Sequence, residues 1–265
     1  MPTTLGPQKS GKNSFGKSAI GLGAVVALVA AIGLSTPTTV TAEEGLSEAQ
    51  EAAIEGLIQK YIQEHPDEIL EAVRAYTERQ KAMASASAEA NLTELREQIL
   101  FDPRAPVAGN PDGDVTVVEF FDYRCGYCKK SLDMVMAMIE EDPNLRVVFK
   151  EFPILSPQSR RASLAALASR EQGKYLEFHY ALMSSRGSFD DQQIMDIAAE
   201  VGLDVAKLQK DMEAPEITAY LDSVQDLARA LDIGGTPTFV VENKIVRGAV
   251  DAETLRQAIA DKRES

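Results

Sequence analysis

The stretch Val115–Cys128, VTVVEFFDYRCGYC, decides the fold. It begins with the apolar run Val115–Phe121, which holds a single acid, Glu119, and it ends in a Cys-x-x-Cys motif. Apolar residues at helical spacing follow the motif, and a second apolar run covers Leu145–Phe152. This order of strand, motif, helix and strand is typical of a βαβ unit, which favours a mostly parallel sheet covered by helices.

The motif contains the only two cysteines of the chain, Cys125 and Cys128. At the start of a helix, the first sulfur lies near unsatisfied N–H groups and the positive end of the helix dipole, which favours the thiolate. A thiolate is the species that attacks disulfides, and a low thiol pKa makes the disulfide more oxidising. The spacing therefore predicts Cys125 as an exposed nucleophile and Cys128 as a buried resolving thiol.

Two other roles for the pair are less favoured. A purely structural disulfide across four residues stabilises a protein by only about 2 kcal/mol in the chain-entropy model. A structural zinc site would need two further ligands, and the chain has only His65 and His179, which are far apart in sequence. We assign no function to either histidine, and we predict a redox-active pair.

Two further features lie near the motif in the predicted fold. Glu119 is costly to bury in an apolar strand, and a raised carboxyl pKa would suit proton transfer to a buried thiol. The alternative is a strand-end acid that reaches solvent. The segment Gly234–Pro237 precedes a late strand, Thr238–Val241. Its proline is either part of an ordinary turn or a cis-proline, and the residues alone leave both readings open.

Length and charge bound the functional class. The chain has 265 residues, 45% of them hydrophobic, which excludes a wholly disordered protein. Its formal net charge is −14. An acidic protein has no electrostatic reason to bind phosphate backbones, so we expect no nucleic acid partner.

The first 42 residues have the three parts of a secretory signal. Three lysines come first, with no acid before Glu43, then the 16-residue apolar run Ala19–Leu34, then small residues up to Ala42. The alternative, a membrane anchor, is disfavoured because a span needs ~20 residues. We predict cleavage after Ala42, which removes the three lysines and changes the net charge from −14 to −17. Export places the cysteines in an oxidising compartment.

Composition and periodicity divide the chain into a signal peptide (1–42), an N-terminal helical segment (43–101), a linker (102–114) and an α/β domain (115–262) with a helical insertion at about 157–231. In the N-terminal segment, helices are predicted over 46–62, from Pro66 to about Met83, and over 92–100. The stretch 84–90 is small and polar. Isolated helices are marginal in water, so their apolar faces must lie against the domain or against copies of the same chain. Both possibilities stay open.

Over residues 115–262 these features resemble the DsbA-type thioredoxin-fold oxidoreductases. The resemblance implies an α/β thioredoxin fold with an inserted helical domain, preceded by an N-terminal helical segment. It also implies that Cys125 is the nucleophile, that Cys128 resolves the mixed disulfide and that Glu119 is the buried acid beneath the active site. No cofactor is expected beyond the redox-active disulfide.

The resemblance further implies the residues that contact substrate. Thr236 and Pro237 match the cis-proline loop, whose backbone pairs with substrate as an added strand does. Gly126 and Tyr127, between the cysteines, are the other expected substrate contacts. The archetypal strong oxidase has Pro-His at these two positions. Because Tyr127 removes a possible cation, we expect a less acidic Cys125 and a less oxidising disulfide than in that oxidase.

The N-terminal helices resemble those of the ScsC-like branch, whose members form oligomers and are linked with copper tolerance. The Gly-Tyr dipeptide and Thr236 are also similar to the isomerase group. We therefore expect a periplasmic thiol:disulfide oxidoreductase, foremost a disulfide isomerase of exported proteins, with a dithiol oxidase as the alternative. Expected partners are misoxidised exported proteins, a membrane redox partner that resets the pair, and further copies of this chain.

A binding role is the other open hypothesis. Reduced Cys125 and Cys128 would supply two soft thiolates, which select Cu(I). The sequence has no Met-x-Met motif or histidine cluster to extend such a site. No other metal site is expected.

Overall fold

A computed structural model describes residues 46–264 of the chain. The predicted signal peptide, residues 1–42, lies outside the described residues. The chain divides into two compact units between Tyr61 and Ile62, and each unit is described by itself. Across residues 46–264, every helix is too short or too polar to cross a membrane.

A five-stranded sheet forms the centre of the second unit, in the order β1-β3-β2-β4-β5. Its strands are β1 (Val107–Gly109), β2 (Val115–Phe121), β3 (Leu145–Glu151), β4 (Thr238–Val241) and β5 (Lys244–Arg247). The pair β2 and β3 is parallel, and the other three pairs are antiparallel. The predicted βαβ unit and mixed α/β fold are confirmed. The expectation of a mostly parallel sheet is wrong, because the edge strand β1 and the late strands β4 and β5 all pair antiparallel to their neighbours.

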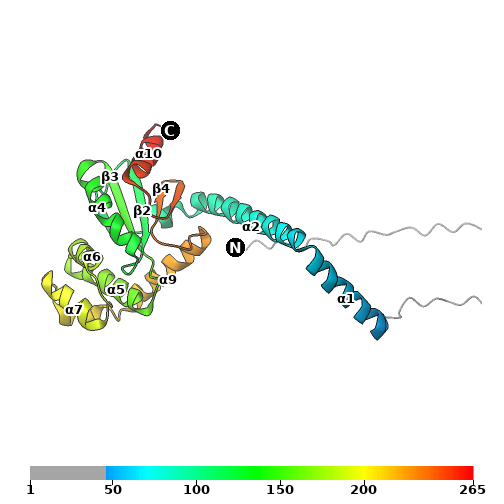
Figure 1. Cartoon of the computed structure of the whole chain (residues 1–265). Helices are drawn as coiled ribbons and strands as arrows, with labels where there is room; N and C mark the ends of the chain where they lie inside the picture. The colour runs from blue at the N-terminus through cyan, green and yellow to red at the C-terminus, as the bar shows by residue number, and fades with distance from the viewer. Residues whose placement is uncertain (1–45, 265) are drawn as a thin grey trace, which may run out of the picture. The chain divides into compact units, whose positions relative to one another are not determined.

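Helices cover both faces of the sheet (Figure 1), and every residue of β2 is therefore buried. Alternate side chains of a strand point to opposite faces, so Val117 and Phe121 join one core and Val118 and Phe120 the other. The first core includes residues of α4 (Gly126–Glu141) and α10 (Ala252–Arg263), and the second includes residues of α3 (Arg96–Leu100) and α9 (Pro215–Ala230).

Between β3 and β4 the regular elements are all helical, as predicted for the insertion. They are α5 (Pro157–Ala168), a 3-10 turn (Ser169–Gln172), α6 (Tyr175–Ser184), α7 (Asp191–Glu200), α8 (Val205–Asp211) and α9. The side chains of Ser156, Asp190 and Asp204 accept hydrogen bonds from backbone N–H groups at the starts of α5, α7 and α8. These caps explain why the helices begin at those residues.

The N-terminal segment forms α1 (Glu48–Glu64) and α2 (Pro66–Glu94). The second helix is longer than predicted, because it continues through residues 84–90 instead of ending near Met83. That stretch contains four alanines and no glycine or proline, and alanine is the strongest helix former. Helical propensity extends the helix here without an apolar face.

Both N-terminal helices carry exposed apolar side chains, each at least 40% accessible: Ile54, Leu57, Ile58, Ile62, Ile69, Leu70, Val73, Tyr76 and Met83. None of the residues of α1 is buried, and in α2 only Ala88 and Leu92 are. Within residues 46–264, most of this apolar surface is therefore exposed to solvent.

The short helix α3, by contrast, is held on the sheet. Its Ile99 and Leu100 are fully buried. Arg146 of β3 donates to the carbonyl oxygen of Leu100 at 2.5 Å, and the buried Lys150 donates to that of Gln98 at 2.9 Å. These two cations satisfy carbonyl groups at the end of the helix, where the helix dipole favours positive charge.

The segment predicted as a linker, residues 102–114, contains a strand. In β1, Ala108 lies opposite Val147 of β3 in an antiparallel pair at the edge of the sheet. A three-residue strand shows no periodicity that a sequence pattern could reveal. Gly109 has a φ of 73° and lies so close to β3 that a Cβ would stand 2.4 Å from the carbonyl oxygen of Leu145. The glycine is therefore required by close packing.

Candidate active site

Cys125 occupies the N-cap position of α4. Its backbone is extended, with φ −74° and ψ 113°, and its sulfur accepts a hydrogen bond from the backbone N–H of Cys128 at 3.4 Å. An N-cap side chain satisfies an N–H group that has no partner inside the helix. The sulfur thus lies where developing negative charge is most stabilised.

The loop before β4 faces this sulfur. Thr236 and Pro237 are joined by a cis peptide bond, so the structure selects the cis-proline reading over an ordinary turn. The thiol of Cys125 donates to the carbonyl oxygen of Thr236 at 3.2 Å. The predicted substrate-binding residues Thr236 and Pro237 therefore lie at the nucleophile, although more than a hundred residues separate them in sequence.

The pKa of Cys125 is lowered to about 5. The largest cause is a hydrogen bond from the Cys128 thiol, which favours the thiolate, while partial burial acts in the opposite direction. The side chain of Thr236 and the backbone N–H groups of Tyr127 and Cys128 also lower the pKa. At neutral pH this sulfur is a thiolate, which is the reactive form.

The two thiols differ in exposure less than the sequence predicts. Cys128 is fully buried, and its pKa is raised by the hydrogen bond to Cys125 and by burial. Cys125 is only 6% exposed, not openly accessible, because the loop that carries Thr236 lies against it. Both cysteines are free thiols in the structure.

Glu119 lies in the interior beneath the cysteines. It is 2% exposed, so the alternative of a strand-end acid that reaches solvent is wrong. Burial and, to a smaller extent, the charge of Cys125 raise its pKa to about 8. One carboxyl oxygen, Oε1, is buried without a hydrogen-bond partner. Since the charge of Glu119 also raises the pKa of Cys128, the acid is within electrostatic reach of both thiols.

Gly126 and Tyr127 form the surface of the motif. Both are exposed, and Tyr127 is 62% accessible. The ammonium of Lys130 lies 5.4 Å from the centroid of the Tyr127 ring, a cation–π distance. Open space surrounds the Cα of Gly126. The structure thus brings all seven predicted site residues together around Cys125.

Asp122 is a site residue that the sequence analysis missed. Its carboxylate accepts hydrogen bonds from the backbone N–H groups of Arg124, Ile154 and Leu155 at 2.7, 2.9 and 3.0 Å. Its carbonyl oxygen accepts from the N–H of Cys125 at 3.0 Å. Asp122 therefore fixes the loop before the nucleophile to the loop after β3. An acid directly after a buried strand was the available signal.

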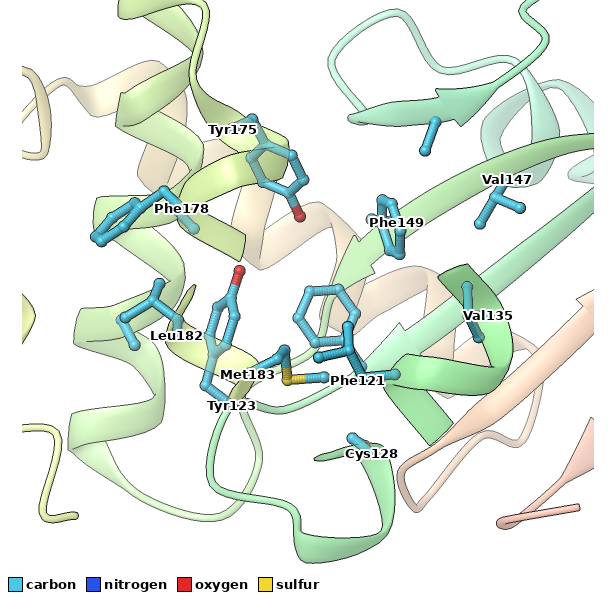
Figure 2. Packing of buried hydrophobic residues seen from close by; sticks show 14 of the residues in the cluster. Phe121, Tyr123, Cys128, Val135, Val147, Phe149, Tyr175, Phe178, Leu182 and Met183 are labelled. Carbon is cyan, nitrogen blue, oxygen red and sulfur yellow. The ribbon is translucent and has the colours of Figure 1, made fainter. Parts of the chain in front are cut away.

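A second missed cluster connects the sheet to the helical insertion (Figure 2). The hydroxyls of Tyr123 and Tyr175 point toward one another and both donate to Oε1 of Glu151, at 2.9 and 2.8 Å. The hydroxyl of Tyr123 also lies 3.1 Å from Nδ1 of His179. Burial raises the pKa of Glu151 to about 8 and lowers that of His179 to about 3, so this histidine is neutral.

Lys129, in the first turn of α4, holds the end of α6. Its ammonium donates to the carbonyl oxygens of Leu182, Met183 and Ser185 at 3.2, 3.0 and 2.7 Å. Burial lowers its pKa to about 8, which leaves it mainly charged at pH 7. Lys129 thus joins the catalytic helix to the helical insertion.

Metal ligands are scarce around this site. Among residues 46–264, no group of three or more His, Cys, Asp and Glu side chains is arranged to hold a metal ion. A zinc site of the ordinary four-ligand kind has no support in this part of the chain. The Cu(I) hypothesis requires only the cysteine pair.

Curated relatives match part of this chain and a smaller part of themselves. The Na(+)/H(+) antiporter NhaA 1 of Salinispora arenicola is 28% identical over 161 residues, which are 60% of this chain and 25% of the antiporter. The chain thus spans about a quarter of the length of that relative.

Solved structures of thiol proteins match over nearly their whole length. A thioredoxin-like oxidoreductase from Silicibacter pomeroyi DSS-3 is 49% identical, with a TM-score of 0.63, and the match covers 64% of this chain and 98% of that one. The thiol-disulfide exchange protein alpha-DsbA2 from Wolbachia pipientis is 30% identical, with a TM-score of 0.63, over 68% of this chain and 97% of that one. Proteus mirabilis ScsC in a transitional conformation is 26% identical, with a TM-score of 0.62, over 82% and 98%.

The family model of the DSBA-like thioredoxin domain matches residues 116–260, which is more than half of the chain. The matched range includes both cysteines, the helical insertion and the cis-proline loop. The predicted thioredoxin fold with a helical insertion, and the resemblance to DsbA-type and ScsC-like proteins, are confirmed. The chain belongs to the family of DsbA-like thioredoxin-domain proteins.

Proposed function

We propose that this protein is a periplasmic thiol:disulfide oxidoreductase that acts chiefly as a disulfide isomerase on exported proteins. The observation that carries the proposal is the sulfur of Cys125, which caps α4, faces Thr236 and has a pKa lowered to about 5. A thiolate at neutral pH beside a second thiol can both form and release a mixed disulfide.

The reaction begins when the Cys125 thiolate attacks a substrate disulfide. One substrate sulfur bonds to Cys125 and the other leaves as a thiolate. In isomerisation, a substrate thiolate attacks another substrate disulfide, and a final attack on the mixed disulfide frees Cys125. If Cys128 instead attacks the sulfur of Cys125, the substrate leaves reduced and the pair becomes a disulfide. That outcome requires a redox partner, which we propose to be a membrane protein, to reset the pair.

Glu119 handles the proton in the resolving step. The buried Cys128 has a raised pKa and must lose its proton before it can attack. A carboxyl with a pKa of about 8 and an unpartnered Oε1 can accept that proton inside the protein. General bases are most effective when their pKa lies near the working pH.

The cis-proline loop and the surface of the motif bind the substrate chain. The carbonyl of Thr236 lies beside the reactive sulfur, and the loop with Pro237 continues into β4, so an extended substrate can pair with its backbone. Gly126 and Tyr127 are exposed on the other side of Cys125 and offer further contacts. Substrate backbone is thereby recognised without a demand for a particular side chain.

Replacement of the nucleophile tests this mechanism. Cys125→Ser should abolish the recovery of active enzyme from a substrate protein with scrambled disulfides, because serine cannot form the mixed disulfide. Cys128→Ser is the matched control, since it keeps the first step and should accumulate a mixed disulfide that is visible by mass spectrometry. Activity retained by Cys125→Ser would refute the mechanism. A pair found fully oxidised in cells would favour the dithiol oxidase over the isomerase.

We propose that the N-terminal helices join copies of this chain. The support is their exposed apolar surface, which the described residues do not cover. In the full chain, Leu57→Glu with Leu70→Glu should lower the mass measured by sedimentation. The control, Gln59→Glu with Gln80→Glu, adds the same charge at polar positions of the same helices and should leave the mass unchanged. Equal masses for both double variants would exclude this interface.

Cu(I) binding is a second candidate, favoured by the two neighbouring free thiols. Titration of the reduced protein with Cu(I) against a competing chelator tests it. Binding that Cys125→Ser removes would support a copper role, and binding no tighter than that of this variant would exclude it.

A further inference from the structure

Four basic residues surround the reactive cysteine. They are Arg124, Lys129, Lys130 and Arg186, of which all but Lys129 are exposed. None of the four forms an ion pair with an acidic side chain of residues 46–264, in contrast to cations such as Arg160, Arg256 and Arg263. In a chain with a formal net charge of −14, these four residues place unpaired positive charge next to the active site.

Three of these cations line a groove of about 600 Å³ that runs between α4 and the end of α6. We call it the basic groove, and the residues that define it here are Gly126, Lys129, Lys130, Asp133, Tyr180 and Arg186. Because Gly126 follows Cys125 directly in sequence, the groove begins one residue from the nucleophile. Asp133 is the single acid in its lining.

Two of the three cations of the basic groove are held in place by contacts within the protein. Lys129 places its three hydrogen bonds on carbonyl oxygens at the end of α6, which holds that helix against α4. Lys130 is steadied by the ring of Tyr127. Positive charge is thus presented on a preformed surface, which reduces the entropy that binding would cost.

We propose that the basic groove binds acidic polypeptide, namely Asp or Glu side chains that flank the cysteine of a substrate or redox partner. The proposal rests on the proposed function and deepens it, because it names a class of substrate for the same site. A positive groove on a negatively charged protein attracts acidic chains to that groove alone. The same attraction therefore brings the substrate to the protein and orients it toward the active site. The attraction raises the rate at which substrate associates with the active site and reacts with Cys125. Salt screens this attraction and so lowers the gain in rate.

The test uses the reduced full chain and three peptides that differ only around one cysteine, flanked by Glu, Gln or Lys. The cysteine carries a thionitrobenzoate group in a mixed disulfide. Attack by Cys125 forms a new disulfide with the peptide and releases the coloured thionitrobenzoate thiolate, so absorbance reports the second-order rate constant. Each value is divided by the rate constant with 2-mercaptoethanol, which removes intrinsic differences between the peptides.

The Glu peptide should react about tenfold faster than the Lys peptide at low salt, and the ratio should approach one at ~0.5 M salt. Lys130→Glu with Arg186→Glu should abolish or invert the ratio. The matched control, Lys210→Glu with Arg229→Glu, changes the net charge equally at exposed positions outside the groove and should keep the ratio.

Failure of the basic groove is distinguishable from failure of the proposed function. If all three peptides react alike, or if the ratio survives charge reversal in the groove, exchange is intact and the groove proposal is overturned. If no peptide reacts faster than with Cys125→Ser, the proposed function fails. In that case the groove proposal is tested by fluorescence anisotropy of labelled peptides with serine in place of cysteine. The proposal is supported if the Glu peptide binds and if Lys130→Glu with Arg186→Glu removes this binding. Equal binding of all three peptides overturns it.

Discussion

Two carboxyl groups, one beneath the cysteines and one beneath the helical insertion, share the same burial, the same face of the sheet and a raised pKa. Glu119 and Glu151 lie on neighbouring parallel strands with side chains on the same face of the sheet, and burial raises the pKa of each to about 8. They differ in their partners. Each acid has one buried oxygen without a hydrogen-bond partner, but the other oxygen of Glu151 accepts from two tyrosine hydroxyls. Burial alone therefore does not separate a structural acid from a reactive one.

Truncation of the two acids should have unequal effects on stability. At pH 5 both acids are protonated in the folded protein, and protonating them on folding costs little free energy. At this pH, Glu151→Ala should lower the free energy of unfolding by about 3 kcal/mol or more. The loss should exceed that of Glu119→Ala by about 2 kcal/mol, because only Glu151→Ala leaves the buried hydroxyl of Tyr175 without an acceptor, whereas Tyr123 keeps Nδ1 of His179. Urea unfolding of the reduced proteins measures both. Equal losses would contradict the distinction.

Catalysis should show the opposite order. Glu119→Gln keeps the shape of the side chain but cannot accept a proton, so the resolution of a mixed disulfide by Cys128 should slow by about 10²-fold. Glu151→Gln should change this rate by less than about threefold, since its site lies behind the tyrosines. Stopped-flow measurement of substrate thiol release gives the rates. A similar slowing in both variants would mean that Glu119 has no special role in proton transfer.

The dependence of stability on pH should reveal both acids. A carboxyl whose pKa rises from 4.5 to about 8 on folding binds its proton more tightly in the folded state. Its stabilising contribution is complete below pH ~4.5 and is lost as the pH rises toward ~8, at most about 1.4 kcal/mol per pH unit. Glu151→Gln and Glu119→Gln should each flatten the fall in unfolding free energy between pH ~5 and ~7.5 relative to wild type. An unchanged slope in either variant would show that its acid is ionised in the fold.

The sequence predicts the parts of the site that lie in one short stretch or carry a distinctive motif. Cys125, Cys128 and Glu119 belong to one strand–helix unit, and Pro237 follows a glycine pair before a strand. The sequence left open whether that proline is cis, because the choice depends on what faces the loop. It also predicted too much exposure for Cys125, since the loop that covers the sulfur comes from a distant part of the chain.

What the sequence does not reveal is pairing across long separations. Glu151 is an ordinary acid in sequence, and only the placement of α6 against β3 brings Tyr175 and His179 to it. The strand β1 is likewise invisible, because its three residues acquire meaning only from their partner β3. Local composition explains a missed helix extension in α2, but tertiary contacts decide the rest.

The hydrogen bonds from Arg146 and Lys150 to α3 determine where this protein can be shortened. A chain cut just before the α/β domain, at residue 102, would lack the carbonyl oxygens of Gln98 and Leu100, so a buried ammonium and a buried guanidinium would each lose an acceptor. A cut before Ala88 would retain both. When the N-terminal helices are exchanged between related proteins, the junction should therefore lie inside α2, before its buried end. The last turns of α2 then remain attached to the α/β domain.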